Sequence, residues 1–131
     1  MKINLLVITL LSCLGFLSCL DNKYVHGKRS YIKHCSSCHM DDGSGIGDVV
    51  PSLELDMDRV RELGLIQCMI RNGVNNPDAI FKMVPNKEIS DVDITNVINY
   101  LLNDMNKLDT IISIDDTKLA LGECKVFDQI N

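Results

Sequence analysis

The chain has 131 residues, enough for one domain, and carries 13 Lys and Arg against 18 Asp and Glu, for a net charge of −5. This balance leaves no basic stripe that could neutralise phosphates, so it argues against a nucleic-acid partner. A domain this small, with three Phe, three Tyr and no Trp, buries limited apolar surface and often depends on a covalent link or a cofactor.

The first segment is apolar. Residues 3–20 contain no charge, while Lys2 precedes them and Asp21 follows them. Such a run is typical of a secretory signal. It also reaches the ~18 residues that a membrane-spanning helix needs, so an uncleaved anchor is the alternative. In both interpretations the domain lies outside the cytoplasm and is tethered to a membrane.

The end of this segment, Leu17-Ser18-Cys19, resembles the lipobox of bacterial lipoproteins. The resemblance implies cleavage after Ser18 and a lipid on Cys19. Phe16 departs from the usual Leu. Cys13, in Leu10-Leu11-Ser12-Cys13, fits the pattern better but would leave a very short signal, so we favour Cys19.

The following elements alternate between short helices and loops. In chain order, the sequence predicts a helix over 24–34, a glycine-rich loop over 41–51, a helix over 56–71, loops near 75–77 and 85–86, and a helix that begins at Ser90. Ser90 is a good N-cap, and Asp91 and Asp93 place negative charge on the first turn, where the helix dipole favours it. The apolar residues of this last helix recur at the spacing of one buried face: Ile94, Val97, Ile98, Leu101, Leu102 and Met105.

The tail beyond residue 107 has a weaker pattern. Ile111, Ile112 and Ile114 are compatible with extended chain, and Asp115–Cys124 with one short helix. We therefore expect an all-α fold, three to four helices wrapped around one site, with long loops that something bound must order. The expected organisation is a signal peptide over 1–18, a short tether over 19–23, one domain over 24–106 and a C-terminal extension over 107–131 that packs on it.

The strongest motif is Cys35-Ser36-Ser37-Cys38-His39, the C-x-x-C-H pattern of c-type haem attachment. Two thiols one helical turn apart can each form a thioether with a vinyl group of one haem, and the histidine that follows can then ligate the iron. A zinc site needs about four ligands, and no second Cys pair or Cys-His pair exists. A thioredoxin-like motif needs a βαβ context, and a simple disulfide between Cys35 and Cys38 would leave His39 unexplained.

Further residues resemble a class I monohaem cytochrome c over about residues 24–106. They are Gly27, Tyr31, the haem motif, Asp42-Gly43-Ser44-Gly45, Pro51-Ser52-Leu53, a Met shortly before a Pro, Ser90-Asp91 and Tyr100. The resemblance implies one covalent haem c. It also implies that Gly27 lets the first helix cross the last one closely, with Tyr31 and Tyr100 at the crossing.

The same resemblance implies partners for the haem ligands. The carbonyl of Pro51 would accept a hydrogen bond from His39 and raise its basicity, although Pro51 could equally be a plain loop proline. Arg71 and Asn72 would approach a haem propionate, although a solvated helix end is the simpler interpretation.

The sixth ligand of the iron is expected to be Met83. It lies in a loop two residues before a proline, where the family carries its axial methionine, although Val84 intervenes where that proline often follows directly. His26 and His34 are poorly placed, and Met105 belongs to an apolar helix face. The alternative for Met83 is a residue that fills a gap in the core.

The remaining cysteines are Cys68 and Cys124, once the signal, the lipid and the haem have taken the other four of six. Two spare thiols in an oxidising compartment indicate a disulfide. It would tie the tail to the second helix. The alternative is two buried free thiols.

The expected function is electron transfer without chemistry on a substrate, so we do not expect an enzyme. The partner would be a redox protein or respiratory complex at the same membrane, on its periplasmic or cell-surface side. Cleavage before Cys19 would leave 12 basic against 18 acidic residues and a net charge of −6, which suits a partner with a basic patch.

If Met83 does not bind, the open iron would suit a sensor or weak peroxidase. A third hypothesis is a subunit of a larger enzyme.

Overall fold

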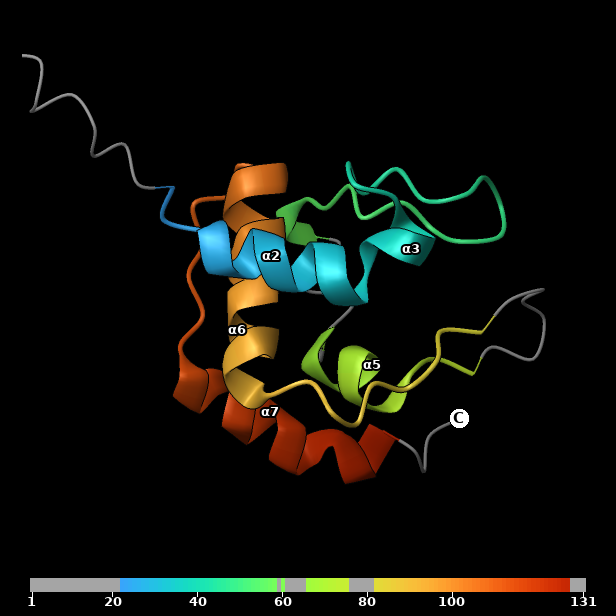
Figure 1. The fold of residues 1–131 in the computed structure, drawn as a ribbon. Helices are drawn as coiled ribbons and strands as arrows, with labels where there is room; N and C mark the ends of the chain where they lie inside the picture. Colours follow the sequence, from blue (N-terminus) through green and yellow to red (C-terminus); the bar gives the residue numbers. More distant parts are fainter. Residues whose placement is uncertain (1–21, 59, 61–65, 76–81, 128–131) are drawn as a thin grey trace, which may run out of the picture.

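The structure is a computed structural model that describes residues 22–58, 60, 66–75 and 82–127. Its helices are α2 (Val25–His34), α3 (Ser36–His39), α5 (Ile66–Asn72), α6 (Asp91–Asn99), the π-helical continuation η2 (Tyr100–Met105) and α7 (Ile114–Phe127) (Figure 1). Within these residues there is no strand, only two isolated bridges, Ile46 with Val50 and Val74 with Met83. The predicted all-α fold is confirmed.

The predicted helices agree with the structure where it describes them. The helix predicted over 24–34 is α2, and the one predicted from Ser90 is α6 with η2. Of the helix predicted over 56–71, residues 57, 58 and 60 are helical, α5 forms its end, and the part between them lies outside the described residues. The signal segment with Cys13 and Cys19 also lies outside them. Among the described residues, no helix has the length and apolarity to cross a bilayer.

The crossing of α2 and α6 organises the domain. A Cβ atom on Gly27 would lie 2.1 Å from the carbonyl oxygen of Asn96, so only glycine allows the two helices to approach this closely. Tyr31 and Tyr100 lie beside the crossing with their ring centroids 5.6 Å apart, within the range of favourable aromatic pairs. The crossing inferred from the family resemblance is therefore present, and Figure 1 shows α2 running across α6.

Gly27→Ala is expected to destabilise the protein by about 1–3 kcal/mol, because the added methyl group overlaps a backbone carbonyl and forces the helices apart. Gly122→Ala in α7 is the control, because a Cβ there meets nothing within 4 Å. Since alanine is the better helix former by about 1 kcal/mol, Gly122→Ala is expected to be neutral or stabilising. Thermal unfolding of both variants measures the difference, and equal effects would rule out the close crossing as the cause.

The start of α6 is tied to α2. The Ser90 hydroxyl accepts a hydrogen bond from the Asp93 amide at 3.1 Å and donates one to the Asp93 carboxylate at 2.7 Å, while the Ser30 hydroxyl donates to the same carboxylate at 2.8 Å. These hydroxyls hold the pKa of Asp93 below its usual value, the Ser90 contribution being the larger. A depressed carboxyl pKa contributes stability that is present near neutral pH and is lost as the pH falls through the folded-state value.

The core has two parts. The first, here called the α5–α6 cluster, joins α5, α6 and η2 to the loops that precede α5 and α6. It consists of Leu55, Ile70, Ile89, Ile94, Ile98 and Leu102. The second, here called the tyrosine cluster, consists of Tyr31, Val97, Tyr100 and Leu101. The apolar face predicted for the last helix is buried except at Met105, which is only partly buried against the tyrosine cluster.

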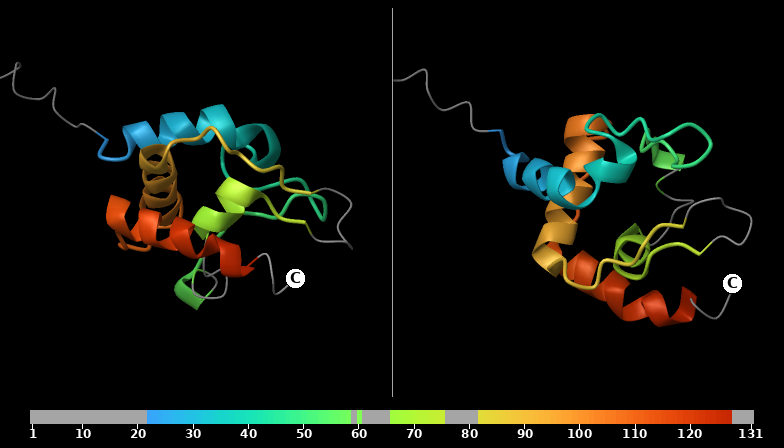
Figure 2. Two further views of the ribbon diagram at one scale, coloured as in Figure 1. Left: turned by 90° about the horizontal axis from the view of Figure 1, so that it is seen from below. Right: turned by 45° about the vertical axis from the view of Figure 1, so that its right-hand side comes forward.

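The helix α7 packs on α5 and α6, and both views in Figure 2 show α5 beside α7. A disulfide joins Cys68 of α5 to Cys124 of α7, with a Cα–Cα distance of 5.4 Å. The buried Thr95 hydroxyl donates to the Thr117 hydroxyl at 2.7 Å and links α6 to α7. The disulfide closes a loop of 56 residues, which in the chain-entropy model stabilises the fold by roughly 4 kcal/mol.

Candidate functional site

The haem motif occupies one tight turn that directly follows α2. The Cys35 amide donates to the Tyr31 carbonyl at 2.8 Å and ends α2, and the His39 amide donates to the Cys35 carbonyl at 2.9 Å and closes α3. Cys35, Cys38 and His39 are thereby held within a single turn. Both thiols are unpaired.

The two thiols differ in their surroundings. Cys38 is exposed, whereas Cys35 is partly buried and packs against the tyrosine cluster. Burial, and to a smaller extent the neighbouring Cys38, raises the pKa of Cys35 to about 11. Cys35 is therefore a protonated thiol at neutral pH.

The imidazole of His39 is oriented by the loop that follows it. Its Nδ1 lies 3.2 Å from the carbonyl oxygen of Pro51. Because a carbonyl can only accept, this hydrogen bond requires the proton on Nδ1, which leaves a lone pair on Nε2. An imidazole held in this way can present Nε2 to a metal ion.

Gly45 brings Pro51 back toward His39. It adopts a φ of +72°, and a Cβ there would lie 2.2 Å from the Val50 carbonyl oxygen, so another residue would push the two sides of the loop apart. The Gly45 amide donates to the His39 carbonyl at 3.1 Å, and the Ile46 amide donates to the Val50 carbonyl at 2.9 Å. The glycine pattern of residues 41–51 thus builds the turn that carries the histidine's partner.

Tyr31 has a second contact that the sequence pattern does not indicate. Its hydroxyl donates to the carbonyl of Met40 at 2.6 Å and so holds the chain that leaves His39. Burial, with Cys35 as the next contribution, raises the pKa of Tyr31 well above its ordinary value. The hydroxyl therefore remains a hydrogen-bond donor throughout the physiological range. This contact is identified only from the folded structure, in which the Tyr31 hydroxyl lies next to the Met40 carbonyl.

Met83 and the haem motif pack against different parts of the core. It is partly buried against the α5–α6 cluster, whereas Cys35 packs against the tyrosine cluster. Its carbonyl accepts a hydrogen bond from the Val74 amide at 3.0 Å, and Figure 1 shows the segment from residue 82 to residue 90 beside α5. The described contacts do not bring Met83 and His39 together directly.

A family model described as cytochrome c oxidase, cbb3-type, subunit III matches residues 22–101. The chain belongs to this family. A comparison with curated proteins found no match. Cytochrome c domains of the cbb3 type bind covalent haem c, so the predicted cofactor is confirmed, as is the haem-based electron-carrier class.

The donor set of this domain fits the cofactor. Two unpaired thiols and an imidazole with a free Nε2 lie within one turn, which are the groups that covalent attachment and iron ligation need. No group of three or more His, Cys, Asp or Glu side chains that could hold a metal ion occurs among the described residues.

His26, His34 and Met105 have surroundings different from those of His39 and Met83. The Nδ1 atom of His34 lies 3.2 Å from the side-chain nitrogen of Asn86, and His26 is exposed. Met105 lies beside the glycine-rich loop: a Cβ added to Gly43 would be 3.1 Å from the Met105 Cε. Met105 therefore supports that loop rather than filling the centre of the core.

Arg71 and Asn72 hold a neighbouring segment of the chain. The Arg71 guanidinium donates to the Lys87 carbonyl and to Asp91, and the Asn72 side chain accepts from the Lys87 ammonium. Arg71 is therefore bonded to two partners and is not a simply solvated helix end. The sequence offered no signal for these partners, which are 16 to 20 residues away from Arg71.

Proposed function

We propose that this cytochrome c domain is an extracytoplasmic one-electron carrier in which His39 and Met83 are the axial ligands of one covalent haem c. The supporting observation is the single turn that holds Cys35, Cys38 and His39, with Nδ1 of His39 facing the Pro51 carbonyl. When bound, the haem supplies a reversible one-electron iron couple. A filled coordination sphere leaves no open position for a substrate, so the protein is not an enzyme in this proposal.

The residues of the chain have separate tasks in this site. Cys35 and Cys38 retain the cofactor, and Pro51 fixes the ring of His39 and raises its basicity, as outer partners of metal ligands do. Met83 contributes a neutral thioether, and His/Met ligation raises the reduction potential. Such a site suits a shuttle that is reduced and reoxidised repeatedly.

The partner proposed for this carrier is a membrane-associated redox protein or respiratory complex with a basic docking patch. Asp41, Asp42 and Asp48 are exposed in the loop that follows the haem motif, and the chain without residues 1–18 has a net charge of −6 from its sequence. Complementary charge accelerates encounter, and the effect weakens with salt. The rate of electron transfer to such a partner should therefore fall as ionic strength rises.

A second candidate function is that of a subunit in an oxidase complex. The description of the matching family, subunit III of a cbb3-type cytochrome c oxidase, favours it. Purification from detergent-solubilised membranes distinguishes the two, because a subunit remains with its complex in a fixed ratio whereas a carrier elutes alone.

The main test is the reaction of the wild-type ferrous protein with carbon monoxide at neutral pH, combined with a redox titration. A carrier with both axial ligands in place titrates reversibly with one electron and does not bind carbon monoxide readily. Ready binding would mean an open iron site, and the sensor or peroxidase hypothesis would replace the carrier.

The proposed location follows from residues 1–18 as a lipoprotein signal and Cys19 as the lipidated residue, with 19–23 as tether, 24–106 as the cytochrome domain and 107–131 as an extension. Cys19→Ala is expected to yield a soluble protein or an unprocessed precursor, because no thiol remains to carry the lipid. Membrane fractionation with mass analysis measures this, and Cys13→Ala is the matched control that should remain lipidated. If Cys19→Ala gives an unchanged mature, membrane-bound form, the anchor is not on Cys19.

A further inference from the structure

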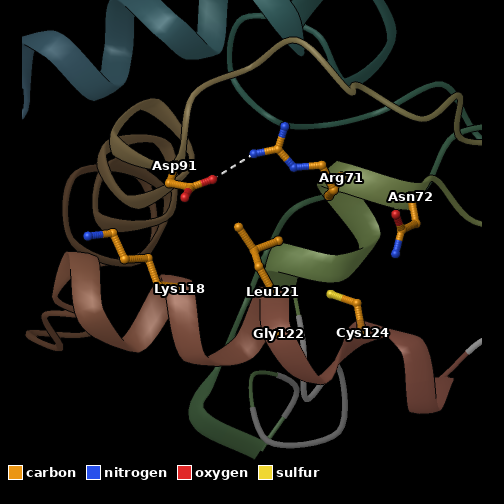
Figure 3. Close-up of a pocket in the computed structure, with 7 residues that line it drawn as sticks. All are labelled: Arg71, Asn72, Asp91, Lys118, Leu121, Gly122 and Cys124. Atoms are coloured by element: carbon orange, nitrogen blue, oxygen red, sulfur yellow. Dashed lines mark hydrogen bonds and ion pairs between the residues drawn. The ribbon is translucent and has the colours of Figure 1, made fainter.

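Arg71, near the end of α5, binds the segment that follows Met83. Its Nη1 donates to the Lys87 carbonyl at 2.9 Å, and its Nη2 donates to Asp91 Oδ1 at 2.8 Å. Figure 3 shows the guanidinium reaching from α5 to Asp91 at the start of α6. The Arg71 side chain is 20% exposed and the Asp91 side chain 40% exposed, so this ion pair lies at the edge of the fold with its cation largely covered.

Two more bonds join the end of α5 to the same segment. The Asn86 amide donates to the Ile70 carbonyl at 3.2 Å, and on the near side of the segment the Val74 amide donates to the Met83 carbonyl at 3.0 Å. Met83 is therefore attached to the chain next to α5 at its own backbone, and again through residues 86, 87 and 91. The position of α5 consequently determines where Met83 lies.

The helix α5 has seven residues, which is too few for a helix to hold its place without tertiary contacts. The disulfide from Cys68 to Cys124 fixes it to α7, and both cysteines are 5% exposed. The hydrogen bond from Thr95 to Thr117 holds α7 against α6 in turn. Because α7 begins at residue 114 and the family match ends at 101, the α7 partners of these contacts, Cys124 and Thr117, lie outside the matched region.

We propose that Arg71 is a positioning residue for Met83, and that α7, through the Cys68–Cys124 disulfide, keeps α5 and Arg71 in the place where they act. The inference rests on the proposed ligation by His39 and Met83. A thioether is a weak, neutral ligand, so the folded chain must hold the sulfur against competing ligands. The contacts of Arg71 hold the chain that follows Met83, and the bond from Val74 holds Met83 at its own carbonyl.

The first test compares Arg71→Gln with Lys118→Gln as complete haem proteins. Lys118 is the matched control, because this cation lines the same hollow between α5, α6 and α7 (Figure 3). Three quantities are measured: the weak near-infrared band of the ferric protein that reports Met ligation, the reduction potential, and the rate at which the ferrous protein binds carbon monoxide. Arg71→Gln is expected to weaken the band, lower the potential and raise the carbon monoxide rate, while Lys118→Gln matches the wild type.

The expected increase in the carbon monoxide rate is about tenfold, because losing both hydrogen bonds of a partly exposed guanidinium shifts a local equilibrium by about that factor. Arg71→Lys should fall between Arg71→Gln and the wild type, since an ammonium keeps the charge but cannot reproduce the two-pronged geometry. Amide exchange at Val74, which bonds to Met83, should accelerate in Arg71→Gln. This readout does not depend on the haem.

The second test replaces both bridge cysteines, Cys68→Ser with Cys124→Ser, so that no single reactive thiol remains. The double variant should change the band, the potential and the carbon monoxide rate in the same direction as Arg71→Gln. A purely structural bridge would lower the unfolding temperature and leave all three unchanged below that temperature.

The outcomes separate this inference from the function on which it rests. If the wild type shows the band and both Arg71→Gln and the double serine variant keep it, with unchanged potential and carbon monoxide rate, the positioning role is wrong and the carrier stands. If the wild type itself lacks the band and binds carbon monoxide readily, the ligation by Met83 and the positioning role both fail.

Discussion

Replacing Cys35 and Cys38 together by serine is expected to abolish covalent haem binding. The hydroxyls cannot form the two thioethers, and His39 alone would leave the cofactor exchangeable. The wild-type polypeptide should stay red after denaturation and exceed its calculated mass by one haem, whereas the double variant should lose its colour in acid–acetone. The expected retention of haem therefore falls from complete in the wild type to none in the double variant.

Ser37→Ala is the matched control, because Ser37 lies between the two cysteines, is exposed, and has its hydroxyl 3.9 Å from the Cys38 sulfur. It should retain the haem fully. Retention of haem through acid–acetone by the double serine variant would show that the motif does not attach the cofactor.

The second large effect is expected for Met83→Ala. Without the thioether, the ferric protein should lose its near-infrared band, the potential should fall because Fe(II) loses a ligand that favours it, and the ferrous iron should bind carbon monoxide readily. Absorption spectra, a redox titration and carbon monoxide binding measure the three changes. An unaltered spectrum and potential in Met83→Ala would exclude Met83 as the ligand.

Met105→Ala is the control for the Met83 variant, because it removes a thioether of the same size that packs against the tyrosine cluster rather than the α5–α6 cluster. Met105 is only partly buried beside Gly43, so the expected loss is about 1–2 kcal/mol, below the roughly 2–5 kcal/mol of a fully buried methionine. The near-infrared band should remain. Its loss in this variant would point to Met105 as the axial ligand.

Much of this site depends on residues that are close in the sequence, so it can be predicted from sequence patterns. Two cysteines and a histidine at C-x-x-C-H spacing lie within one turn in any helical chain, so no distant contact is needed to predict their proximity. Ser90 with Asp93 is a similar case, since an N-cap and its partner are three residues apart. The buried face from Ile94 to Leu102 follows from helical spacing alone.

The resemblance to cytochromes c supplied contacts that spacing does not. By itself, Gly27 only weakens a helix. The helix crossing of the cytochrome c family explains why glycine stands there, and a Cβ on Gly27 would indeed lie 2.1 Å from the Asn96 carbonyl oxygen. The pairing of Tyr31 with Tyr100 has the same origin.

The sequence by itself determined the attachment turn, the caps and the apolar faces, because each depends on residues about three or four positions apart, where backbone geometry decides which side chains meet. Only the tertiary structure decided that Arg71 grips Lys87 and Asp91, that the Tyr31 hydroxyl holds Met40, and that Thr117 joins Thr95. Arginine, tyrosine and threonine side chains can serve many partners with similar energy. The choice among those partners is made by how the helices pack, α2 with α3 for Tyr31 and α5, α6 and α7 for Arg71 and Thr117, and no local pattern records this packing.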